Sequence, residues 1–128
     1  MGYCSDVGLA LTKNGVDTLH TKLDSQEVSD ELRSKVNDLL GYAEKHYADK
    51  DTGAEIWYWE WIKWYGGDCV YYEDIEFIED TLKTLEFGDY RFIRIGEEYD
   101  DTEVAGGFWE NPFDLDFVRS INIAKPEY

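Results

Sequence analysis

The sequence is poor in the side chains that most often carry out catalysis or hold metal ions. It has two cysteines and two histidines among 128 residues. Cys4 and Cys69 lack the short spacing of a zinc site, so we expect both to be buried, reduced thiols of a cytoplasmic protein. His20 and His46 both fall in the first predicted helix region, and neither is near a cysteine in sequence. We therefore expect no catalytic pair, no enzymatic activity and no cofactor.

Long hydrophobic runs and phosphate-binding loops are also missing. The first six residues have neither the basic start nor the apolar core of a signal peptide, and no run approaches the ~20 apolar residues that cross a bilayer. Gly66-Gly67 precedes Asp68, whose carboxylate would stand where a phosphate binds. These absences predict a cytoplasmic protein that binds neither membranes nor nucleic acid directly.

Positive charge is scarce as well. The chain has 12 Lys and Arg residues against 29 Asp and Glu residues, which gives a net charge of −17. Residues 51–128 hold 20 of the acids but only six of the bases, so the excess lies in the second part of the chain. Such a charge repels nucleic acid and attracts basic surfaces. Two explanations stay open: the charge keeps the protein soluble, or it binds a basic partner.

Aromatic residues are abundant, and four of the five tryptophans fall within residues 57–64. Segment 55–65 predicts a strand, because aromatic and β-branched residues favour extended backbone and glycines lie on both sides of it. Side-chain alternation predicts one face of Ile56, Tyr58, Ile62 and Trp64 and another of Trp57, Trp59, Trp61 and Tyr65. Both faces are apolar, so either the strand is covered twice or one tryptophan row is an exposed binding surface.

The rest of the chain predicts an α+β fold. Further strands are expected at 3–12, 89–96, 104–109 and 115–123, and apolar residues at helical spacing predict helices at 16–47, broken near Asp24, and at 68–87. The order is β-α-β-α-β-β-β. We expect residues 1–128 to form a single acidic domain, a two-layer sandwich with a mixed or mostly antiparallel sheet of four to five strands and two helices on one face. The other face would be open to solvent or a partner.

Acidic residues are concentrated in two places. Glu73, Glu76 and Asp80 would share one face of the helix at 68–87, where like charges one turn apart cost roughly 0.2–0.5 kcal/mol per pair. The loop 97–103 adds Glu97, Glu98, Asp100, Asp101 and Glu103. This loop lacks the ligand spacing and the turn glycine of an EF-hand, so we expect no metal site.

Three short motifs carry a resemblance to a known group of proteins. Met1–Val7, Tyr90–Glu97 followed by Asp100-Asp101, and Lys63–Tyr65 together resemble small phage and prophage proteins that open with M-G-Y-x-S-D-V and contain an F-I-R-I-G-E segment before an acidic pair. Cys4 stands where an arginine is common in that group. The resemblance brings no activity with it. It implies an accessory phage protein that acts in the bacterial cytoplasm on host or competitor machinery.

The main functional hypothesis is a non-enzymatic protein that inhibits a nucleic-acid-handling host defence system, as an anti-CRISPR or other anti-defence protein. It would present carboxylates in place of phosphates to a basic surface. The partner-binding residues would be Glu73, Glu76, Asp80, Glu97, Glu98, Asp100, Asp101 and Glu103. The alternatives are a small-ligand or peptide-binding module with an aromatic surface of Trp57, Trp59, Trp61 and Trp109, and a homodimer that joins two open sheet faces.

Overall fold

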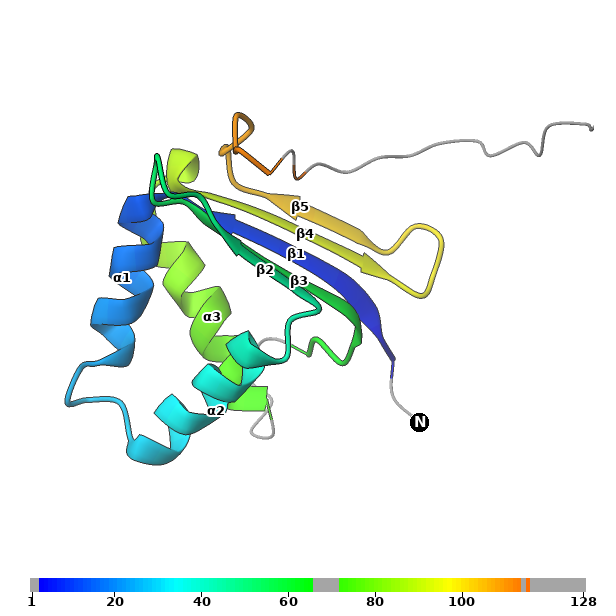
Figure 1. Ribbon diagram of the computed structural model, residues 1–128. Coiled ribbons are helices and arrows are strands. Elements are labelled where there is room, and N and C mark those ends of the chain that lie inside the picture. Colours follow the sequence, from blue (N-terminus) through cyan, green and yellow to red (C-terminus); the bar gives the residue numbers. More distant parts are fainter. Residues whose placement is uncertain (1–2, 66–71, 114, 116–128) are drawn as a thin grey trace, which may run out of the picture.

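The structure, a computed structural model, describes residues 3–65, 72–113 and 115. Three helices lie on one face of a five-stranded sheet with strand order β2-β3-β1-β4-β5 (Figure 1). Every strand pair is antiparallel. The predicted α+β architecture, with helices on one face of a mostly antiparallel sheet, is therefore confirmed, although the first helical region forms two helices.

The central strand is β1 (Ser5–Leu11), and β3 (Glu55–Ile62) and β4 (Tyr90–Gly96) pair with it on either side. The short strands β2 (Lys45–Ala48) and β5 (Thr102–Ala105) form the two edges. Val7, Leu9 and Leu11 of β1 alternate toward the helices and form the centre of the core. This alternation is the pattern expected for a strand whose two faces differ.

Side-chain hydroxyl groups cap the first two helices. The helical region ends before the predicted residue 47, because the following residues pair with another strand. Thr12 caps α1 (Lys13–Leu23), and Ser29 caps α2 (Asp30–Gly41). The predicted extension of helix to residue 47 is wrong, because residues 45–48 form β2. Their backbone groups bond to β3, which outweighs the weak helical preference of these residues. His46 therefore lies on an edge strand, where its ring stacks on Trp57.

Helix α3 (Glu73–Thr84) buries Ile75, Ile78 and Leu82 against the sheet, as their spacing predicted. The helix ends before Gly88, and residues 87–89 form a short 3₁₀ turn that leads into β4. The predicted helix start at Asp68, like Cys69, lies outside the described residues. Cys4 is buried. The predicted strand at 104–109 is shorter than expected, because only Thr102–Ala105 pairs with β4.

The tryptophan strand contains an irregularity that alternation did not predict. Trp61 has φ 54, a left-handed backbone conformation, and the register of β1 against β3 shifts between Ser5 and Val7. Trp57 and Trp59 are 2% and 1% exposed and lie in the core beneath the helices, whereas Trp61 is 64% exposed. Beyond the irregularity, Trp64 joins the Trp59 side, with 5.3 Å between ring centroids. The prediction that Trp57, Trp59 and Trp61 share one face is wrong.

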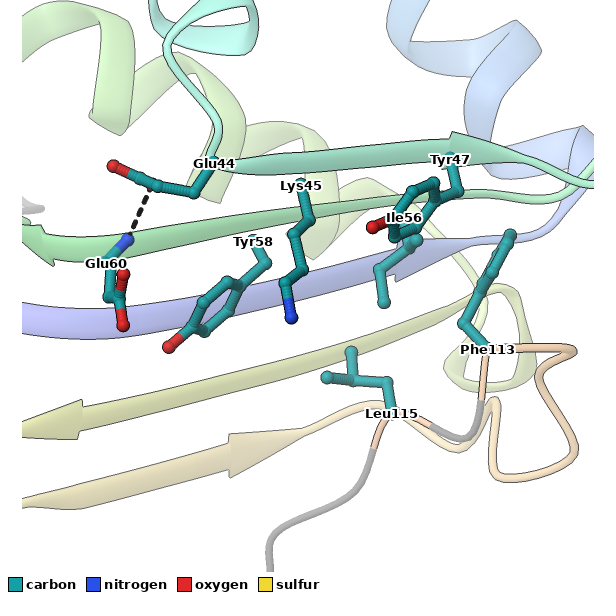
Figure 2. A pocket seen from close by; sticks show the side chains of 8 residues that line it. All are labelled: Glu44, Lys45, Tyr47, Ile56, Tyr58, Glu60, Phe113 and Leu115. Atoms are coloured by element: carbon teal, nitrogen blue, oxygen red, sulfur yellow. Dashed lines mark hydrogen bonds between the residues drawn. The ribbon is translucent and has the colours of Figure 1, made fainter.

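The sheet face away from the helices, here called the open face, carries Ile56 and Tyr58 of β3 opposite the small residues Gly8 and Ala10 of β1. Leu115 lies over this face, because a Cβ atom at Gly8 would be only 2.8 Å from Leu115 Cδ1. Figure 2 shows Phe113 and Leu115 beside Ile56 and Tyr58. These four residues help to line a hollow with a volume of about 440 Å³. Apart from Leu115, the predicted final strand at 115–123 lies outside the described residues.

Candidate functional site

A cleft separates α3 from the β4–β5 side of the sheet, and we call it the α3–β5 cleft. Its volume is about 560 Å³. Its lining residues are mostly polar or aromatic: Tyr3, Trp64, Tyr65, Glu79, Lys83, Arg94, Asp101 and Glu103. Arg94 and Glu103 lie opposite one another on β4 and β5, and Glu79 and Lys83 lie one turn apart on α3. The cleft therefore joins the acidic helix to the acidic hairpin.

Arg94 organises the hairpin wall of this cleft. Its Nη2 lies 2.6 Å from Asp101 Oδ1, its Nη1 lies 3.1 Å from Asp101 Oδ2, and its Nε lies 3.1 Å from Glu103 Oε1. Tyr3 Oη donates a hydrogen bond of 2.6 Å to Asp101 and accepts one of 2.9 Å from the Glu98 backbone N–H. The Arg94 and Tyr3 hydrogen bonds lower the pKa of Asp101 from 3.8 to about 2. These contacts tie the base of the hairpin to the sheet.

Glu79 is the unusual carboxylate of the helix wall. Burial, and next the nearby charge of Glu103, raise its pKa above the usual 4.5, while the Trp64 indole, Lys83 and Arg94 partly oppose the rise. Neither cation forms an ion pair with Glu79 in the described part of the chain. Trp64 is 5% exposed, and its Nε1 has no hydrogen-bond partner among those residues. The cleft thus holds a half-buried acid beside the buried indole N–H of Trp64.

The predicted partner-binding acids differ in whether their carboxylates already pair with other side chains of the protein. Glu97, Glu98 and Asp100 are exposed at the turn of the β4–β5 hairpin, which projects past the helical layer (Figure 1). Their side chains make no hydrogen bond or ion pair within the described residues. Asp101 and Glu103 lie in the same hairpin, but Arg94 pairs with both of them. The hairpin turn therefore presents three free carboxylates on an anchored base.

The three acids predicted to share one face of the helix have different surroundings. Glu73 turns toward α2, where its carboxylate lies 3.0 Å from Lys35 Nζ and raises the pKa of that lysine. Asp80 is exposed and lies 3.8 Å from Lys83 Nζ, beside the cleft. Glu76 is half-buried one turn before Asp80. Glu73 thus belongs to a contact between helices, and Asp80 lies beside the cleft through its contact with Lys83.

Sequence reasoning did not select Glu79. The spacing of Glu73, Glu76 and Asp80 favoured another face of the helix. The pKa of Glu79 is raised first by burial and next by Glu103, which is distant in sequence. An acid next to the buried stripe of Ile75, Ile78 and Leu82 was the only local signal.

The four tryptophans proposed as an aromatic surface do not form one. Trp57 and Trp59 belong to the core, which removes the platform that the alternative hypothesis required. Trp61 and Trp109 are both exposed, but Trp61 lines a hollow between α2 and α3, whereas Trp109 packs edge-on against Phe87 near the start of β4. The prediction of one aromatic surface that contains all four tryptophans is therefore wrong.

In the described ranges, no group of three or more His, Cys, Asp or Glu side chains is arranged to hold a metal ion. None of the helices described is long and apolar enough to cross a membrane. No family model, curated protein or solved structure matches the chain. The α3–β5 cleft and the hairpin turn beside it are the candidate functional site.

Proposed function

We propose that this protein is a non-enzymatic acidic inhibitor that binds the basic, nucleic-acid-binding surface of a bacterial defence protein, such as a CRISPR effector. The observation that carries the proposal is the anchored hairpin turn with Glu97, Glu98 and Asp100 next to a cleft lined by further acids. Carboxylates displayed on a rigid base can take the places that phosphates occupy on a basic surface.

The hairpin is held in one conformation by its own contacts, which favours a role in binding a partner over a role in solubility alone. Arg94 holds Asp101 through its two terminal guanidinium nitrogens, Nη1 and Nη2, and Tyr3 holds both Asp101 and the Glu98 backbone. A surface ordered before binding loses less conformational entropy when the complex forms. Acids that only provide solubility need no such support, because solubility depends on net charge rather than on geometry.

An exposed aromatic residue in the same turn gives further support. Tyr99 is 85% exposed and stands between Glu98 and Asp100. Tyrosine is enriched at interface positions that contribute most to binding energy, whereas an aromatic ring at a loop tip does nothing for solubility. The resemblance to phage proteins supports a partner in the bacterial cytoplasm.

The test is a charge reversal at the hairpin turn. The variant E97K/E98K/D100K changes three exposed carboxylates without side-chain partners in the described residues, so we expect it to fold. The matched control, E27K/D51K/E86K, makes the same change in net charge at exposed acids elsewhere. Both are compared with the unchanged protein for inhibition of DNA binding and cleavage by a panel of purified defence nucleases, including CRISPR effectors.

We expect the unchanged protein to inhibit at least one nuclease in competition with DNA, and to weaken as salt rises from about 50 to 200 mM. The hairpin variant should lose at least about tenfold in inhibition, and the control should stay within about twofold. Equal losses in the two variants would mean that net charge alone acts. No inhibition of any nuclease in the panel would contradict the proposal.

A further inference from the structure

The chain that follows β5 is anchored where it passes onto the open face. The Phe108 backbone N–H donates a hydrogen bond of 3.1 Å to the Tyr90 carbonyl at the start of β4. Asn111 is only 4% exposed, and its side chain accepts from the Leu115 backbone N–H at 2.8 Å and donates to the Phe108 carbonyl at 3.0 Å. This turn seats the Leu115 side chain over Gly8 in the middle of β1. The chain therefore already lies on the open face where the described residues end.

The anchored turn leaves part of the open face uncovered. Ile93 pairs with Gly8 of β1 and with Val104 of β5, so these three residues form one row across the face. Ile93 is 5% exposed, but Val104 is 45% exposed. Ile95, two positions further along β4, shares the face and is 39% exposed. Two apolar side chains near Gly8 thus remain in contact with solvent.

We propose that segment 116–123, which follows Leu115 in the sequence, packs on this uncovered part of the open face through Phe117, Ile121 and Ile123. The inference is independent of the proposed function. Its first support is the alternation of the sequence, because these three residues and Leu115 all stand at odd positions and share one side of an extended chain. Three of the four residues at the even positions of the segment are polar, as expected for the side that faces solvent.

The segment is long enough to reach the exposed apolar side chains. Neighbouring strands lie about 4.8 Å apart, so Val104 on β5 is about 10 Å from Gly8 on β1. Ile95 is on β4, between these two strands. An extended chain rises about 3.3 Å per residue, so the sequence from Leu115 to Ile123 spans up to about 26 Å. The anchored turn can therefore stay as it is while the segment covers both side chains.

Charge gives a second support. The hollow beside Tyr58 on the open face is lined by two acids, Glu44 and Glu60, and Lys45 is the only cation among its described lining residues. Figure 2 shows Lys45, Tyr58 and Glu60 pointing to the side of the sheet on which the chain arrives. Segment 116–123 contains one basic residue, Arg119, at an odd position. An arginine on the packing side of the segment complements the negative charge of this hollow.

The first test measures nuclear Overhauser effects in the full chain, between the methyl groups of Ile95 and Val104 and the side chains of Phe117, Ile121 and Ile123. We expect both open-face residues to contact at least one of the other three. A mixture of isotope-labelled and unlabelled chains, filtered for contacts between chains, should give no such signal. Absence of these contacts would overturn the inference. Contacts found only between chains would also overturn it, because a second copy would then cover the face.

The second test compares two double variants of the full chain. I121S/I123S removes apolar side chains from the odd positions, and the matched control V118S/A124S changes even positions. Well-dispersed NMR spectra establish that both variants are folded. We expect the midpoint of urea unfolding to fall by at least about 0.5 M in I121S/I123S and by less than about 0.2 M in the control, because only the odd positions are buried. An unchanged midpoint in I121S/I123S, or equal losses in the two variants, would contradict the packing.

Discussion

Replacing Trp59 and Trp61 in turn by phenylalanine tests the most consequential feature of the fold, the irregularity in β3. The two residues lie two positions apart on one strand, and regular alternation would give them the same surroundings. In the structure Trp59 is in the core and Trp61 is on the surface. The same substitution should therefore have very different effects on the free energy of unfolding.

The expected cost at Trp59 has two parts. Its Nε1 donates a buried hydrogen bond of 2.8 Å to the Leu39 carbonyl, near the end of α2, where only the longer contact from the Tyr42 N–H would remain. Loss of that bond costs about 1 kcal/mol. Phenylalanine also removes about three heavy atoms from a buried site, which costs about 2 kcal/mol in lost burial and cavity formation. W59F should lose about 3 kcal/mol in all.

The matched variant W61F should change stability by less than about 0.5 kcal/mol, because its side chain is exposed and makes no hydrogen bond in the described residues. Urea unfolding followed by circular dichroism gives both values, and the Tm of W59F should fall by roughly 10 °C. Similar losses in the two variants, or a loss below about 1 kcal/mol in W59F, would refute the assignment of Trp59 to the core and Trp61 to the surface.

Three further predictions concern backbone strain and pH. G106A should lose more than about 2 kcal/mol of stability, because Gly106 has φ +84 and a Cβ atom there would clash with the Tyr90 carbonyl oxygen. G88A, with open space around it, should be close to neutral in the same thermal melts. The pKa of Asp101 is lower in the folded protein, so its contribution to the free energy of unfolding is present above pH 3.8 and is lost as pH falls toward about 2. The urea midpoint of D101N should therefore fall less over that pH range than the midpoint of the unchanged protein, and equal falls would contradict the Arg94 pairing. Burial and the charge of Glu103 raise the pKa of Glu79 in the folded protein, so stability falls as pH rises from 4.5 through that raised value. E79Q should therefore be more stable than the unchanged protein in urea unfolding at pH 7, and a destabilised E79Q would contradict the unfavourable, half-buried charge.

Local patterns were enough for the parts of the fold that depend on single segments. The alternation in 90–96 correctly separated Phe92 and Arg94 from Ile93 and Ile95, and the spacing of Ile75, Ile78 and Leu82 correctly identified the buried side of α3. Side-chain period is a property of the segment itself, so it can be read without knowing the neighbours. The concentration of acids in 97–103 was equally visible in sequence.

Local patterns did not predict the strand at residues 45–48 or the exposed position of Trp61. Both depend on the partner strand: β2 exists because β3 offers backbone groups to pair with, and the left-handed conformation at Trp61 shifts the register of β3 against β1. Neither the pairing nor the irregularity leaves a periodic trace in its own segment. Tertiary contacts therefore decided which tryptophans are core.

The candidate site divides in the same way. Sequence alone determined the excess of acids and their concentration on α3 and in the hairpin, because charge and composition need no fold. Only the tertiary structure decided which acids are free: it paired Asp101 and Glu103 with Arg94, turned Glu73 toward Lys35, and brought Glu79 to Glu103 beside the buried Trp64 indole. The physical reason is that pairing, burial and pKa depend on neighbours in space, which come from segments far apart in the chain.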